Sequence, residues 1–89
     1  MEGLEYTVPI KQLVKMSVKT RVDKFIKGTS KIWWNEGDLY IDFYTFGHLE
    51  FRYVEYDYLS QVIQGIDRNW IVHNAVSCFK VHIARKYFR

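Results

Sequence analysis

The stretch Lys31–Tyr56, KIWWNEGDLYIDFYTFGHLEFRYVEY, decides the fold because aromatic and β-branched residues dominate it. Such residues pack well on a pleated, half-buried surface and favour strands. Asn35–Asp38 forms a turn in which Gly37 is free to adopt positive φ, and Phe46–His48 forms a second turn. We therefore predict three antiparallel strands, at about residues 31–35, 38–45 and 49–55.

Side chains alternate between the two faces of these strands, because successive residues of a strand point in opposite directions. One face is apolar, and it carries Leu39, Ile41, Phe43, Leu49, Phe51 and Tyr53. The opposite face of the middle strand carries Tyr40, Asp42 and Tyr44. The apolar face is the predicted core side of the sheet, and the tyrosine-bearing face is a candidate surface.

The segment Val14–Gly28, VKMSVKTRVDKFIKG, supports two interpretations. Its first half alternates like a half-buried strand, but the segment also divides into two short helices around a turn near Ser17. Thr20 opens a capping-box pattern, and Gly28 stands where the C-cap of a helix takes positive φ. We favour the two helices, at about Pro9–Met16 and Arg21–Lys27.

Two further helices are predicted after the strands. Asp57 can cap a helix that ends near Arg68. The last segment, about residues 71–87, has more residues at helical spacing than at strand spacing, although Phe79, Val81 and Ile83 also alternate. The predicted fold is a small single α+β domain over residues 1–89. It has two short N-terminal helices of helix-turn-helix type, a three-stranded antiparallel meander and two C-terminal helices.

Length and composition bound the class of protein. The chain contains 1 cysteine, so no intrachain disulfide forms and a reducing compartment is expected. The N-terminal MEGLEYTVPI lacks the features of a secretory signal, and no stretch reaches the ~18 apolar residues of a membrane span. We expect a cytoplasmic protein with no membrane partner. Its aromatic content of 18% exceeds what a small core can hide, and homodimer formation would cover some of these rings.

Charge is segregated along the chain. Residues 1–33 and 67–89 are basic, whereas residues 34–66 carry six acidic side chains and a single arginine. One interpretation is that the basic ends form a nucleic-acid-binding face. The other is that the oppositely charged segments attract each other within the fold.

The second predicted helix suggests DNA binding. It would expose Lys19, Thr20, Arg21, Lys24 and Lys27, and Arg85 and Lys86 offer further cations near the C-terminus. With the following hairpin in the place of a wing, residues 7–45 resemble a winged helix-turn-helix, although the turn offers Glu36 and Asp38 in place of basic residues. The resemblance implies a DNA-binding regulator, such as an accessory protein of a mobile element.

The tyrosine-bearing face supports an alternative function. Tyr40, Asp42, Tyr44 and Tyr56 would make an acidic, tyrosine-rich patch, and tyrosines are enriched where proteins bind one another. This predicts a protein-interaction module or an inhibitor, unless a helix covers the face and buries the rings.

Enzymatic chemistry is a third interpretation. Asp42 followed by Glu50 and Arg52 on the next strand resembles the acidic set of a metal-dependent nuclease, and alternation places Glu50 and Arg52 on the same face. The alternative is that Arg52 only pairs with Asp42 or Glu50 across the sheet. His73, Cys78 and His82 are zinc-ligand types without a fourth partner, and no carboxylate lies near Cys78 in sequence to support a nucleophile. We therefore expect a binding protein with no catalytic residues, metal or cofactor.

Overall fold

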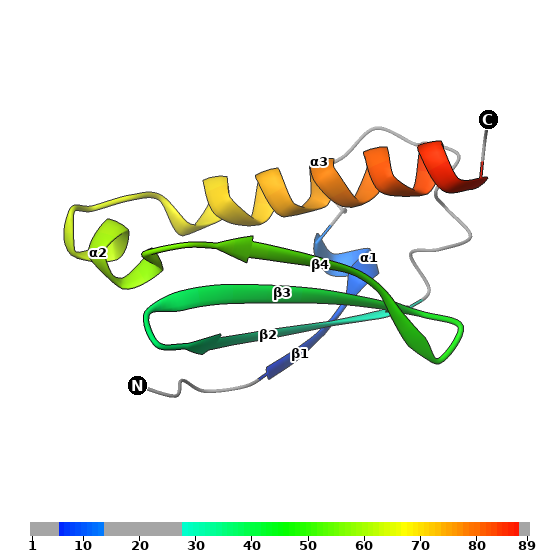
Figure 1. The fold of residues 1–89 in the computed structure, drawn as a ribbon, viewed down its shortest axis with the longest axis horizontal. Coiled ribbons are helices and arrows are strands. Elements are labelled where there is room, and N and C mark those ends of the chain that lie inside the picture. The colour runs from blue at the N-terminus through cyan, green and yellow to red at the C-terminus, as the bar shows by residue number, and fades with distance from the viewer. Residues whose placement is uncertain (1–5, 14–27, 88–89) are drawn as a thin grey trace.

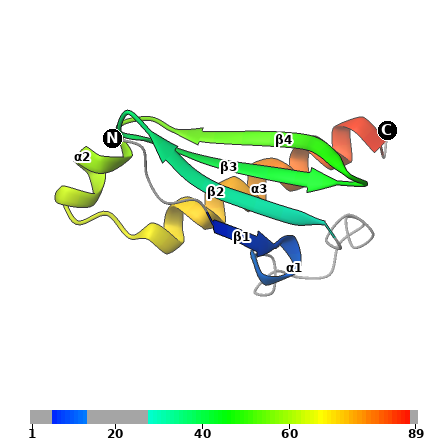
Figure 2. The same cartoon turned by 90° about the horizontal axis from the view of Figure 1, so that it is seen from below.

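The computed structural model describes residues 6–13 and 28–87. The elements are β1 (Tyr6–Pro9), α1 (Ile10–Leu13), β2 (Thr29–Asn35), β3 (Asp38–Thr45), β4 (His48–Glu55), α2 (Tyr58–Ile63) and α3 (Arg68–Tyr87). The strands form one antiparallel sheet in the order β1-β2-β3-β4, and α3 runs along it (Figure 1). In Figure 2 the strands lie in front of α3. We call the helix-covered side of the sheet its inner face and the other side its outer face.

The core lies between α3 and the inner face. Buried residues recur along α3 at helical spacing, and they are Ile71, Ala75, Val76, Phe79 and Ile83. The ring of Phe79 stacks on that of Phe43 from β3, with the centroids 4.4 Å apart. Ile10 of α1 is fully buried and completes the core beside β1 and β2.

The prediction of two N-terminal helices and three strands is wrong, because residues Tyr6–Pro9 form a fourth strand paired with β2. Thr7 and Val8 are β-branched and suit a strand, and Pro9 is tolerated because β1 is an edge strand. Only Ile10–Leu13 of the first predicted helix is helical within the described part of the chain. The predicted turn and the predicted helix Arg21–Lys27 lie outside the described residues.

Gly28 has a different role from the predicted helix C-cap. Its φ is not positive, unlike the φ of Gly37, Gly47 and Gly65. A Cβ atom on Gly28 would instead collide with the carbonyl oxygen of Tyr44. Glycine is therefore required here by the close approach of two backbone segments.

The three predicted strands are present as β2, β3 and β4, joined by the two predicted turns. Both turns place two consecutive residues at positive φ, 54° and 88° at Glu36–Gly37 and 52° and 83° at Phe46–Gly47. This is the type I′ geometry that matches the twist of paired strands. Phe46 is unusual in it, because a bulky side chain disfavours the left-handed backbone by about 1–2 kcal/mol.

Replacing Phe46 by Asn is expected to raise the free energy of unfolding by about 1 kcal/mol, because Asn tolerates positive φ better than Phe. Urea unfolding followed by circular dichroism measures the change. Tyr56→Asn is the matched control, since Tyr56 is an exposed aromatic without positive φ. A loss of stability in Phe46→Asn would show that contacts of the ring outweigh the backbone strain.

The C-terminal helices differ in their ends from the prediction. α2 stops at Ile63, before Gly65 with φ 89°, and does not extend to Arg68. Asp57 makes no side-chain cap, whereas Oδ1 of Asp67 accepts a hydrogen bond from the N–H of Asn69 and caps α3. The predicted final helix is confirmed.

No helix in the described part of the chain combines the length and apolar character that crossing a membrane requires.

Candidate functional site

A cluster of four side chains lies on the outer face and spans three strands. Register places Trp33 of β2 opposite Tyr40 of β3, and Asp42 of β3 opposite Arg52 of β4. All four project away from the inner face, because their neighbours Ile32, Ile41 and Phe43 belong to the buried core. We call Trp33, Tyr40, Asp42 and Arg52 the Arg52 cluster.

Asp42 organises the Arg52 cluster. Its carboxylate accepts hydrogen bonds from Nε and Nη2 of Arg52 at 2.7 and 3.0 Å, and from Nε1 of Trp33 at 2.9 Å. The Asp42 side chain is 1% exposed, whereas that of Arg52 is 45% exposed. The hydrogen bond to Asp42 also raises the pKa of Arg52 above its ordinary value, so this side chain stays charged.

The aromatic rings complete the arrangement. Trp33 and Tyr40 stack face to face with centroids 4.2 Å apart and an interplanar angle of 11°. The guanidinium of Arg52 lies 5.5 Å from the Trp33 ring centroid and 5.6 Å from that of Tyr40, within range of a cation–π contact. Arg52 is therefore held by a buried carboxylate and beside two rings, with part of its surface facing solvent.

The structure places the predicted interaction residues in two regions. Tyr40, Asp42 and Tyr44 share the outer face of β3, which no helix of the described part of the chain covers. Tyr56 lies in the turn after β4 and is 69% exposed. Because the Asp42 charge is paired with Arg52, the face is aromatic with a neutralised centre and lacks the acidic character that the sequence suggested.

A second cluster surrounds Glu50 on the inner face. A register shift between Phe43 and Tyr44 leaves Glu50 as an extra residue of β4, a β-bulge that turns Glu50 and Phe51 to the same side. The Glu50 side chain is fully buried. Its carboxylate contacts Thr45 Oγ1 at 3.2 Å, Tyr87 OH at 2.9 Å, His82 Nε2 at 2.8 Å, Lys86 Nζ at 3.1 Å and His48 Nε2 at 3.8 Å.

These partners keep Glu50 ionised. Burial alone would raise the pKa of Glu50, but hydrogen bonds with His82, Lys86, Tyr87 and Thr45 together lower it to about 2. The buried carboxylate thereby ties the last turns of α3 to the β3–β4 hairpin. We call Glu50 and these contacts the Glu50 cluster, and we assign it a structural role.

The predicted nuclease residues do not meet. Asp42 lies on the outer face with Arg52, whereas Glu50 faces α3, so the two carboxylates are on opposite sides of the sheet. Strand alternation predicted one face for Glu50 and Arg52, and the bulge separates them. No group of three or more His, Cys, Asp or Glu side chains in the described ranges is placed to hold a metal ion.

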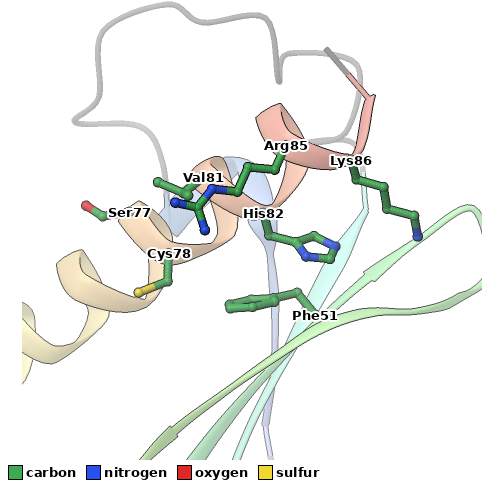
Figure 3. A pocket seen from close by; sticks show the side chains of 7 residues that line it. All are labelled: Phe51, Ser77, Cys78, Val81, His82, Arg85 and Lys86. Carbon is green, nitrogen blue, oxygen red and sulfur yellow. The ribbon is translucent and has the colours of Figure 1, made fainter. Parts of the chain in front are cut away.

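A carboxylate that was not expected near Cys78 and His82 is present, because Glu50, which is distant in sequence, binds Nε2 of His82. The thiol does not take part, since Figure 3 shows the Cys78 sulfur directed away from the His82 ring. The described contacts therefore do not assemble a nucleophile, base and orienting acid in one line.

The DNA-binding interpretation is not supported by the described part of the chain. Lys19, Thr20, Arg21, Lys24 and Lys27 lie outside it. Arg85 and Lys86 occupy the last turn of α3, where Lys86 binds Glu50. The strand β1 occupies part of the segment that the helix-turn-helix interpretation required, and this overturns that assignment.

Comparisons of this chain with models of protein families, with curated proteins and with solved structures found no match. The geometry of the described residues therefore carries the functional conclusion.

Proposed function

We propose that this chain is a non-enzymatic protein-interaction module whose binding surface is the outer face of the sheet. The observation that carries the proposal is the Arg52 cluster. Trp, Tyr and Arg are the residue types that dominate the binding energy of protein interfaces. Here one of each lies together on the face of the sheet that α3 leaves uncovered.

Pre-organisation strengthens this proposal. Immobilising a side chain on binding costs about 0.5–1.5 kcal/mol, and the cluster is already ordered before a partner arrives. Asp42 accepts hydrogen bonds from both Arg52 and Trp33, and the Trp33–Tyr40 stack restrains the rings. A partner would therefore gain most of the contact energy without ordering these groups.

The charges indicate the chemistry of the partner. Lys31 and Arg52 are the two cross-strand neighbours of Asp42, so the row across the outer face holds two cations and one buried carboxylate. Arg52 uses Nε and Nη2 on Asp42, which leaves Nη1 to meet an acceptor. The partner surface that fits is apolar, to cover the rings, with an acidic side chain opposite Arg52.

Arg52→Lys tests the proposal, because lysine keeps a positive charge over Asp42 but lacks the planar fork. A partner captured by the wild-type chain is purified and titrated by calorimetry. The variant is expected to bind about ten-fold or more weakly. Arg68→Lys, at the exposed start of α3, is the matched control and should bind as the wild type does. Equal affinities of a captured partner for Arg52→Lys and the wild type would contradict the proposal.

A further inference from the structure

A pocket of about 600 Å³ lies between α3 and β4, on the side of the sheet opposite to the Arg52 cluster (Figure 3). It is lined by Phe51, Ser77, Cys78, Val81, His82, Arg85 and Lys86. The α3 residues recur at intervals of three or four and so form one flank of the helix. α1 contacts α3, β1 and β2, and β1 and β2 lie at the opposite end of the strand order from β4. No residue of α1 is among the described residues that line the pocket.

The pocket combines an apolar part with a basic part. Phe51 and Val81 provide apolar surface, and Val81 is 48% exposed. His82, Arg85 and Lys86 provide basic groups, and none of the described lining residues is acidic. The Glu50 carboxylate that binds His82 and Lys86 is fully buried below them, so it is not presented to a ligand. The pocket therefore complements a ligand with an apolar group and a negative charge.

The position of β4 indicates what kind of ligand fits. β4 ends the strand order and is 8 residues long, so along one side its backbone groups have no strand partner in the described sheet. An extended peptide can add to such an edge, taking affinity from backbone hydrogen bonds and specificity from alternate side chains. Phe51 belongs both to β4 and to the pocket wall, so the edge and the pocket adjoin.

We infer that this edge and pocket form a binding site for an extended acidic peptide, which adds to the sheet as a strand beside β4. An apolar side chain of the peptide packs between Phe51 and Val81, and a carboxylate two positions along, on the same face of the peptide, meets Arg85. Arg85 already has a contact within the chain, and its guanidinium has five N–H donors, so the peptide carboxylate binds it in addition to that contact. The site is separate from the outer face, so it does not depend on the function proposed above.

Cys78 provides the readout, because it is the chain's only cysteine, is exposed and lines the pocket. Peptides are selected on the wild-type chain from a random library of about seven residues, which matches most of β4 in length. The selected peptides are expected to share an apolar residue and an acidic residue two positions apart. At about ten times Kd they should slow alkylation of Cys78 by iodoacetamide about ten-fold.

Variants of the chain separate the two surfaces. Arg85→Gln is expected to lose the protection of Cys78, whereas Arg52→Lys and the control Arg68→Gln keep it. In the peptide, replacing the acidic residue by lysine, or an inner residue by proline, should also abolish protection, since proline removes a backbone donor.

Four results would overturn the inference. One is a selection that yields no acidic peptides, and another is equal protection by the lysine-substituted peptide. The third is protection of Cys78 that rises with protein concentration alone, which would assign the edge to a second copy of this chain. Protection by octanoate but by no peptide would assign the pocket to small anionic amphiphiles and would equally overturn it.

Discussion

Replacing Glu50 by Gln is expected to lower the free energy of unfolding at pH 7 by about 3 kcal/mol. The substitution keeps the shape of the side chain but removes its charge and turns an acceptor into a donor. His82, Lys86 and Tyr87 of α3 then face a buried group that can no longer accept all their hydrogen bonds. The contact between the end of α3 and the β3–β4 hairpin should weaken most.

The pH dependence identifies the charge as the cause. The pKa of Glu50 is about 2 in the folded chain and near 4.5 when unperturbed. A lowered pKa stabilises the folded state above about pH 4.5, and this contribution is lost as the pH falls towards 2. The wild type should therefore lose about 3 kcal/mol over this interval that Glu50→Gln does not lose.

Urea unfolding of both chains at several pH values between 2 and 7 gives the comparison. Glu36→Gln is the control, because Glu36 lies exposed in the β2–β3 turn. Its stability should follow that of the wild type at each pH. If the free energy of unfolding changes with pH in the same way for the wild type and Glu50→Gln, the Glu50 cluster does not stabilise the fold through its charge.

Gly28→Ala is expected to lower the free energy of unfolding by about 3 kcal/mol, the upper end for overpacking. The added methyl group would collide with the carbonyl oxygen of Tyr44, which is backbone and cannot rotate away as a side chain can. β2 and β3 would have to separate where Thr29 pairs with Tyr44. Chemical unfolding at pH 7 measures the loss.

Gly37→Ala is the matched control for Gly28→Ala. Gly37 has φ 88° and open space around its Cα, so alanine there meets backbone strain but no collision. Its expected loss is about 1 kcal/mol. A Gly28→Ala loss no larger than that of Gly37→Ala would contradict the close approach of the two backbone segments.

Part of the candidate surface could be predicted from the chain. Alternation placed Tyr40, Asp42 and Tyr44 on one face, and the structure agrees. Trp33 was not predicted to be part of this surface. It could have been, because counting residues outward from the two-residue turn at Glu36–Gly37 pairs Trp33 with Tyr40. The pairing of Asp42 with Arg52 could not be counted in this way, because the bulge at Glu50 shifts the register by one residue.

The sequence by itself determined which segments of residues 29–55 are strands and turns, and that the last segment is a helix, because strand alternation, turn glycines and helical spacing are effects of neighbours along the chain. It misplaced Leu49, which was predicted on the apolar face but is 43% exposed, because the bulge at Glu50 places Leu49 opposite Tyr44. Only the tertiary structure decided that Tyr6–Pro9 is a strand, since its pairing with β2 joins residues far apart in sequence. The same holds for Glu50, whose side of the sheet follows from donors on α3 that strand periodicity cannot reveal.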